Sequence, residues 1–308
     1  MNDRVNEILE KRKKFPNNPG MKINLYYDYE YISLASSLRK NSIENIESVM
    51  VGDSYFMTHM GLPSTRLNKE LTNEAINILP SLIKEVRVAI DSNEIENVSP
   101  PLLMADIPDG ISSSELLKIV NEYLKNGADI IKIEAETISD LWPLKEIDIS
   151  PKYWAVHIGY TPQKNDNRVY GGSVEEIKEL ENVLDVAANL GARFVILERL
   201  TEIANSVLTE IAVKKNVVPY SIFSGRAFLG GQSLNIWDAV VKAEKESIFF
   251  PPTATIDRSD VKDKYNNLLI EDCITKLIGL CKANVFPPSP RNPVSVDEFL
   301  SIIKEYSL

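Results

Sequence analysis

The sequence predicts a single-domain (β/α)8 barrel, in which eight parallel strands form a closed sheet surrounded by helices. Short apolar runs alternate with amphipathic helical segments along most of the 308 residues, which is typical of a parallel sheet covered by helices. Eight apolar runs are present, and this number favours a closed barrel over an open sheet. Hydrophobic residues make up 44% of the chain, so it can bury one large core, and a barrel of about 250 residues fits within its length.

The predicted strands are short runs of β-branched or apolar residues. In order they are KINLY at 22–26, ESVMVG at 47–52, PLLMAD at 101–106, ADIIKIE at 128–134, YWAVH at 153–157, RFVILE at 193–198, VVPYSIF at 217–223 and ESIFF at 246–250. Between them, segments 114–127 and 173–191 have helical periodicity, and each closes on a glycine suited to the left-handed position after a helix. We therefore place the barrel at about 20–250.

The two ends of the chain are expected to add helices to the barrel within one domain, 1–308. The first fourteen residues are charged and periodic, which predicts an extra N-terminal helix and no signal peptide or membrane span, so a cytoplasmic protein is expected. Residues 260–308 predict a C-terminal helical appendage that serves oligomer contacts. Cys273 and Cys281 lie there, and we expect them to pack rather than to form a disulfide or a zinc site.

The charge of the chain limits its partners. The formal net charge is -10, whereas surfaces that bind nucleic acid or anionic membranes are rich in lysine and arginine. No repeat of 20 to 50 residues is evident, so repeat architectures are excluded as well. We therefore expect a small-molecule substrate, with neither nucleic acid nor membrane as a partner.

Ionisable residues follow the predicted strands, where the active site of a parallel barrel lies. Lys132 and Glu134 are two residues apart, so both side chains should point to one face of their strand while Ile131 and Ile133 point to the other. Five strands end in this way, and the residues are Asp53 with Ser54, Asp106, Lys132 with Glu134, His157, and Glu198. This conjunction predicts a polar site at the mouth of the barrel.

The carboxylates predict a metal-activated 2-oxo acid. Asp53, Asp106 and Glu134 would repel one another in a small space unless a cation offset their charges. Oxygen ligands suit a hard ion such as Mg²⁺, with Mn²⁺ or Co²⁺ as substitutes, and suit zinc less well. A 2-oxo acid would chelate such an ion through its carboxylate and keto oxygens. The ion would then acidify the hydrogens on the carbon next to the keto group. Glu198 is our hypothesis for the base, and Lys132 for the charge that stabilises the enolate.

Each of these residues also has a purely structural interpretation. A strand-end aspartate often caps the next helix or forms a turn, and a buried histidine is often a satisfied core residue. The structural alternatives are a helix cap at Asp53, a turn at Asp106 ahead of Pro108 and Gly110, an edge-strand ion pair of Lys132 with Glu134, a core position for His157, and an exposed pair of Glu198 with Arg199. Five independent strand ends in one pattern favour a functional site over these alternatives.

The order and spacing of several motifs resemble the ketopantoate hydroxymethyltransferase family. The motifs are VGDS at 51–54, ADIP at 105–108, GADIIKIE at 127–134, HIGYTPQ at 157–163 and FVILE at 194–198, and DYEY at 28–31, GGQ at 230–232 and WDA at 237–239 extend them. The resemblance covers about residues 20–245. It implies a (β/α)8 barrel of the phosphoenolpyruvate mutase and isocitrate lyase superfamily, in a homo-oligomer that is often decameric.

The resemblance also implies an activity and site residues. The family transfers a hydroxymethyl group from 5,10-methylenetetrahydrofolate to 3-methyl-2-oxobutanoate with Mg²⁺, in pantothenate biosynthesis. Carried over, it implies Asp53 and Asp106 as metal ligands with Glu134 close to the metal. By the same resemblance Asp53, Ser54 and Lys132 contact the oxo acid, Glu198 is the base, and His157 lies beside the substrate.

The sequence departs from the family around this site. Asp109 replaces an aromatic residue, Ala135 and Glu136 replace two glycines, Arg66 follows Thr65, and IFSGR at 222–226 replaces a glycine-rich segment. Strand alternation predicts that Glu136 projects beside Glu134, with Arg66 and Arg226 available to pair with such charges. These changes predict a different oxo acid or one-carbon donor. Two alternatives stay open, namely a folate-independent lyase, aldolase or mutase, and a catalytically silent barrel.

Overall fold

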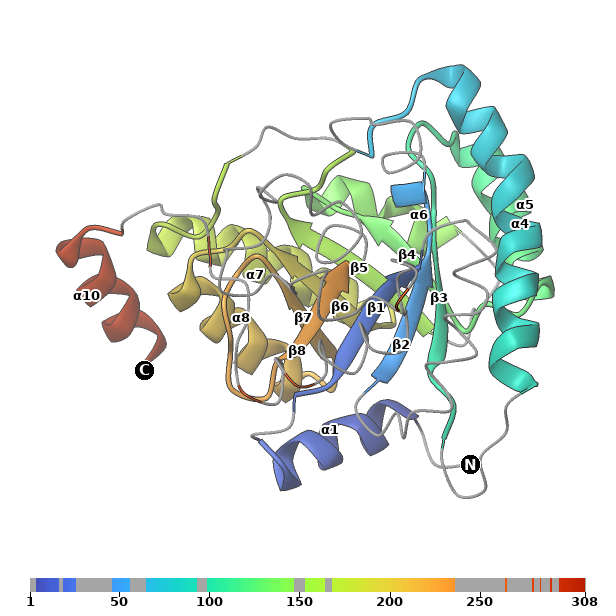
Figure 1. Cartoon of the computed structure of the whole chain (residues 1–308). Helices are drawn as coiled ribbons and strands as arrows, with labels where there is room; N and C mark the ends of the chain where they lie inside the picture. The colour runs from blue at the N-terminus through green and yellow to red at the C-terminus, as the bar shows by residue number, and fades with distance from the viewer. Residues whose placement is uncertain are drawn as a thin grey trace.

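Eight strands form a closed parallel barrel in the order β1 to β8 (Figure 1), which confirms the predicted fold class. The computed structural model describes residues 4–16, 19–25, 46–55, 65–92, 99–146, 153–163, 168–235 and 294–307, and the single positions 264, 279, 283 and 289. The strands are β1 Met21–Leu25, β2 Ile46–Val51, β3 Leu102–Asp106, β4 Ile130–Glu134, β5 Tyr153–Gly159, β6 Ala192–Glu198, β7 Val218–Ile222 and β8 Gly231–Asn235. The first seven overlap the predicted runs.

The prediction of the last strand is wrong. The run at 246–250 lies outside the described residues, and β8, with the sequence GQSLN, closes the barrel by pairing with both β7 and β1. The close contacts of this strand explain its unusual composition. A Cβ at Gly231 would lie 2.3 Å from a guanidinium nitrogen of Arg12 and 2.7 Å from the Tyr220 ring, and Ser233 accepts a hydrogen bond from Lys22 inside the barrel.

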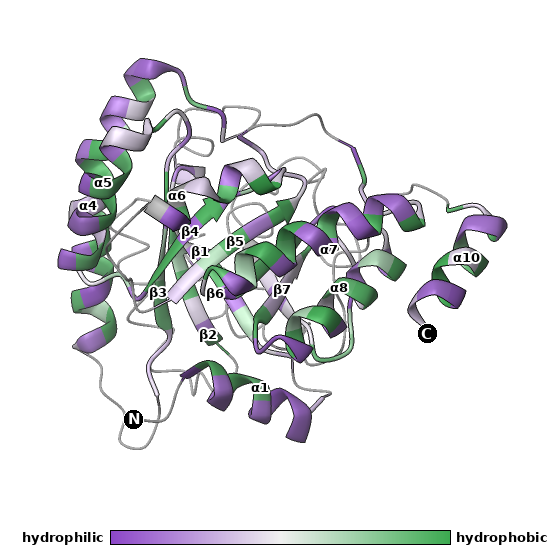
Figure 2. Ribbon diagram, turned by 180° about the vertical axis from the view of Figure 1, so that it is seen from behind, coloured by the Kyte–Doolittle hydropathy of each residue, from purple (hydrophilic) through white to green (hydrophobic). Residues whose placement is uncertain are grey.

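Helices pack around the strands through their apolar faces. They are α4 Lys69–Asp91, α5 Ser113–Lys125, the short η1 Ile138–Leu141 and α6 Trp142–Glu146, α7 Val174–Asn189 and α8 Glu202–Lys214, and Figure 2 shows hydrophobic and hydrophilic stripes along them. Gly127 and Gly191, which follow α5 and α7, have φ angles of 100° and 98°, as predicted for these helix ends. None of the helices in the described part of the chain is both long and apolar enough to span a membrane.

The N-terminal helix α1 Arg4–Lys14 closes the end of the barrel where the strands begin (Figure 1), which confirms the expected extra helix. Its Arg12 is buried, with a guanidinium nitrogen 2.5 Å from Glu47 Oε2, and donates a hydrogen bond to the Pro219 carbonyl oxygen. Tyr220 Oη donates to the same Glu47 oxygen, at 2.9 Å. A buried network of charge and hydroxyl thus ties α1 to β2 and β7.

The last helix, α10 Val296–Tyr306, confirms the predicted short helix at the end of the chain. Tyr306 Oη donates to Glu181 Oε2 of α7 at 3.1 Å, so α10 packs beside the barrel. Apart from single positions and residues 294–307, the predicted appendage, with Cys273 and Cys281, lies outside the described residues, as do the DYEY and WDA motifs.

Candidate active site

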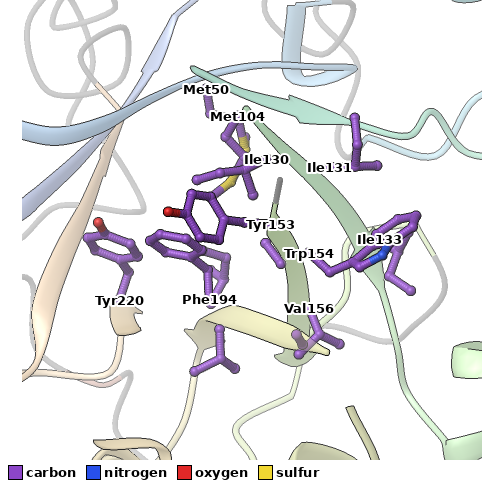
Figure 3. Close-up of a cluster of buried hydrophobic side chains, with 14 of the residues drawn as sticks. Met50, Met104, Ile130, Ile131, Ile133, Tyr153, Trp154, Val156, Phe194 and Tyr220 are labelled. Carbon is purple, nitrogen blue, oxygen red and sulfur yellow. The ribbon is translucent and has the colours of Figure 1, made fainter. Parts of the chain in front are cut away.

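An apolar layer inside the barrel supports the polar site above it. Figure 3 shows Met50, Met104, Ile130, Tyr153, Phe194 and Tyr220 in one buried cluster. The Tyr153 and Phe194 rings meet edge to face with centroids 5.5 Å apart. Because side chains two residues apart on a strand share a face, Asp106 and Lys132 occupy the next layer above Met104 and Ile130. The floor of the site is therefore formed by buried apolar and aromatic side chains.

Asp53 and Asp106 come together where β2 and β3 end. A Cβ at Gly52 would lie 2.4 Å from the Asp106 Cβ, so glycine permits this close approach. Gln163 Nε2 donates to Asp53 Oδ2 at 2.6 Å, and Lys132 Nζ donates to Asp106 Oδ2 at 2.5 Å. The second oxygen of each aspartate, Oδ1, is buried and accepts no hydrogen bond from any described residue.

Burial makes these two carboxylates unfavourable as anions. Burial raises the pKa of Asp53 well above its ordinary value, and the negative charge of Asp106 raises it further. Burial likewise raises the pKa of Asp106, although the neighbouring ammonium of Lys132 opposes this effect. Two buried oxygens without partners, on hard carboxylate groups, are the donor set that a divalent cation such as Mg²⁺ prefers. Asp53 and Asp106 therefore fit the expected ion.

Glu134 differs from the two aspartates because both of its oxygens already have close polar neighbours. Its Oε1 lies 3.6 Å from Lys132 Nζ and 3.5 Å from His157 Nδ1, and the Gln163 backbone N–H donates to Oε2 at 3.1 Å. Burial raises its pKa, but the charges of Lys132 and His157 lower it more. Within the described residues, no group of three or more His, Cys, Asp or Glu side chains is arranged as a metal site. Direct binding of metal by Glu134 stays a prediction.

His157 and Glu198 form a second charged pair, opposite the aspartates. His157 Nε2 lies 3.0 Å from Glu198 Oε2, so the imidazole stands between Glu198 and Glu134. Burial and Lys132 lower the pKa of His157, but its contacts with the two glutamates outweigh them and leave it raised. Glu198 is only 6% exposed, so the alternative of an exposed pair with Arg199 is wrong. Arg199 instead lies over the Tyr160 ring.

Most of the residues at which the sequence differs from the motifs it resembles form hydrogen bonds with backbone groups. Arg66 Nε donates to the Gln163 carbonyl oxygen at 3.1 Å. Asp109 Oδ2 accepts from the Leu67 backbone N–H at 3.0 Å. Arg226 lies on the connection between β7 and β8 and donates to the Pro16 carbonyl oxygen at 2.6 Å, beside the end of α1. Arg66 and Asp109 thus fasten the segment before α4 to the rim of the site, whereas Arg226 helps to anchor α1.

The prediction that Glu136 projects inward beside Glu134 is wrong. Strand β4 ends at Glu134, and the chain then turns into η1. The backbone N–H groups of Glu136 and Thr137 donate to Asp140 Oδ2, and the Glu136 side chain is exposed. Strand alternation stops where this capped turn begins, so it cannot be extended to Glu136. Ser54, by contrast, is buried next to Asp53 in the chain, and its contact with the oxo acid stays a prediction.

Two buried residues of the site were not found from the sequence. Gln163 joins Asp53 and Glu134 through its side chain and backbone, and the HIGYTPQ motif alone does not indicate this role. Lys22 lies inside the barrel, where its Nζ donates to Asn24 Oδ1 at 2.5 Å and to Ser233 Oγ at 3.2 Å. Lys22 and Asn24 alternate on their strand as Lys132 and Glu134 do, so the same alternation rule could have found Lys22.

Comparison with known proteins confirms no family. No family model matches the chain, and no curated protein matches its sequence. Solved structures similar to a large part of the chain include a putative dehydratase from Mesorhizobium loti, at 11% identity and a TM-score of 0.41 over 66% of this chain. This chain covers only 47% of that dehydratase.

Two further structures have a similarly low similarity to this chain. One is a phosphonopyruvate hydrolase in complex with oxalate and Mg²⁺, at 9% identity and a TM-score of 0.43 over 71% of each chain. The other is a putative dihydrodipicolinate synthase family protein from Coccidioides immitis, at 10% identity and a TM-score of 0.44 over 94% of each chain. Similarity this low carries no functional inference, so the fold assignment rests on the strand pairing itself.

Proposed function

We propose that this protein is an enzyme that binds a small 2-oxo acid at the mouth of the barrel and removes a proton from its C3 carbon. The observation that carries the proposal is the pair of buried, unpartnered oxygens on Asp53 and Asp106, opposite the buried pair of His157 and Glu198. One side of the site is suited to a divalent cation, and the other offers a carboxylate as a proton acceptor. Removal of a proton from C3 of a 2-oxo acid requires both the cation and the proton acceptor.

Asp53 and Asp106 would hold the cation, Mg²⁺ or in its place Mn²⁺ or Co²⁺, with water and substrate as its other ligands. When bound, such an ion supplies Lewis acidity that makes the C3 hydrogens of a 2-oxo acid more acidic. Gln163 orients Asp53 by donating to its Oδ2, and Lys132 orients Asp106 in the same way. These two contacts fix the orientation of both carboxylates, and with it the position of each unpartnered Oδ1.

The remaining residues bind the substrate and move its proton. Lys132 presents a buried ammonium, which stabilises a carboxylate or an enolate oxygen in a site of low polarity. Glu198 accepts the proton from C3. His157 holds the Glu198 carboxylate from one side, at 3.0 Å, and Glu134 lies on the other side of the imidazole at 3.5 Å. Ser54, buried beside Asp53, would donate a hydrogen bond to the oxo acid.

The next step of the proposed reaction forms a carbon–carbon bond between C3 and the methylene carbon of a one-carbon donor. Both carbon–nitrogen bonds from that carbon to the donor break, water supplies the hydroxyl oxygen, and the donor leaves with two added hydrogens. The sequence resemblance supports 5,10-methylenetetrahydrofolate as the donor and 3-methyl-2-oxobutanoate as the acceptor. The buried amine of Lys22 favours a second candidate, a folate-independent lyase or aldolase that acts on a more polar oxo acid. Calorimetric titration with tetrahydrofolate separates the two, because only the first requires a folate site.

The proposal is tested by exchange of solvent deuterium into C3 of 2-oxo acids, followed by NMR. We expect exchange in the presence of Mg²⁺, and a loss of at least about 100-fold in Glu198→Gln, because general bases contribute roughly that much. Glu210→Gln is the matched control, since Glu210 is exposed on α8 and pairs with Lys214. Wild-type protein that exchanges no 2-oxo acid, or Glu198→Gln with an undiminished rate, would refute the proposal.

A further inference from the structure

Lys22 is a buried amine for which the proposed proton transfer has no use. It is 1% exposed, and its two hydrogen-bond acceptors, Asn24 Oδ1 and Ser233 Oγ, are both uncharged. Lys132, in the same barrel, has carboxylate oxygens of Asp106 and Glu134 within 3.6 Å. A buried ammonium is costly without a charged partner. Among the residues that the structure describes, Lys22 thus lacks the close carboxylate that Lys132 has.

The surroundings of Lys22 place it next to the proposed reaction. Its side chain points into the barrel from β1, between Asn24 of the same strand and Ser233 of β8. It is close enough to Lys132 of β4, Asp106 of β3 and Glu198 of β6 for their charges to act on its amine. Glu198 is the proposed base for C3. The amine of Lys22 therefore lies inside the barrel between β1 and β8, within electrostatic reach of both the proposed metal ligand Asp106 and the proposed base Glu198.

We infer that Lys22 binds a second carboxylate of the substrate, carried on the C3 side, so that the protein acts on a 2-oxo dicarboxylic acid. This inference rests on the proposed function, because it takes C3 to lie near Glu198. An aliphatic substituent would leave the buried ammonium of Lys22 without a charged partner. A carboxylate would supply one, through a charge-assisted hydrogen bond, and such bonds are stronger than those between neutral groups.

The electrostatics of Lys22 give this binding a signature. Burial and the positive charge of Lys132 lower the pKa of Lys22 to about 7, against the opposing charges of Asp106 and Glu198. A carboxylate placed beside the amine favours its charged form and raises that pKa again. Binding of a dicarboxylate above neutral pH should therefore take up a proton, whereas binding of a monocarboxylate should take up less.

The test compares two oxo acids that differ only in a terminal group, 2-oxoglutarate and 2-oxopentanoate. Their binding to the full chain in Mg²⁺ is measured by calorimetry at pH 8, in buffers of different ionisation enthalpy. We expect wild-type protein to bind 2-oxoglutarate at least about tenfold more tightly, as one charged hydrogen bond provides, with proton uptake. In Lys22→Met the preference and the extra uptake should disappear, while 2-oxopentanoate binding is kept.

Two further variants make the result decisive. Lys22→Arg keeps the charge and should keep part of the preference, and Lys125→Met removes an exposed lysine of α5 and should change nothing. Equal binding of the two acids by wild-type protein, or a preference that survives in Lys22→Met, overturns the inference. Deuterium exchange reports separately on the proposed function. If dicarboxylate binding depends on Lys22 but no deuterium exchange occurs, the proposed proton transfer is refuted and the assignment of Lys22 is supported.

Discussion

Replacing Lys22 by methionine should stabilise the protein at neutral and acidic pH, although it removes two buried hydrogen bonds. The pKa of Lys22 falls from its ordinary 10.5 to about 7 in the fold, through burial and the charge of Lys132. The folded state therefore binds this proton more weakly than the unfolded chain does. At about 1.4 kcal/mol for each pKa unit, charging the buried amine costs the fold roughly 5 kcal/mol when the pH is below 7.

Part of this gain is offset in the variant. Asn24 and Ser233 each lose a hydrogen bond from the amine, at about 1 to 2 kcal/mol apiece for a buried acceptor left unpaired. Methionine retains most of the apolar stem, so little packing is lost. The net stabilisation of Lys22→Met is therefore about 1 to 3 kcal/mol at pH 6.

Urea denaturation of wild type and Lys22→Met at several pH values measures this difference. The cost of Lys22 is fully present below its folded pKa of about 7 and fades as the pH rises toward its ordinary 10.5, so the gap should shrink between pH 7 and pH 10. Lys125→Met, which removes an exposed lysine, should show no such trend. A variant less stable than wild type at pH 6, or a gap independent of pH, would contradict the reasoning.

Three further predictions concern the metal site and the closed end of the barrel. Asp53→Asn should raise the melting temperature of metal-free protein, because burial raises the pKa of Asp53 in the fold. The difference in melting temperature from wild type should widen as the pH rises above about 4. Added Mg²⁺ should not raise the melting temperature of the variant further. Gln163→Leu removes the donor to Asp53 and should weaken Mg²⁺ binding about 10- to 100-fold by calorimetry, so an unchanged Kd would argue against an orienting role. Glu47→Gln leaves the buried Arg12 without its carboxylate and should cost about 3 to 5 kcal/mol in urea denaturation. Glu305→Gln, which breaks the exposed pair with Lys178, should cost less than about 1 kcal/mol, and equal losses in these two variants would be the contrary result.

Apolar runs predicted seven of the eight strands because those strands bury residues on the face that meets the helices. The prediction of the eighth strand was wrong for a physical reason. Gly231 must leave room for Arg12 and Tyr220, and Ser233 receives the hydrogen bond of Lys22, so β8 has little of the apolar character that marks a strand. The prediction for Glu136 was wrong for another reason. It extended the side-chain alternation of β4 beyond Glu134, where the strand ends and a turn begins.

The placement of ionisable groups at the strand ends was readable from the chain alone, because the two-residue alternation of a strand and the geometry of a parallel barrel are local and general rules. Lys132 and Glu134 share a face for that reason. Which oxygens stay free on Asp53 and Asp106, and which partners surround Lys22, depends on side chains from distant strands meeting in one register. Those contacts exist only once β1 to β8 have closed into a barrel.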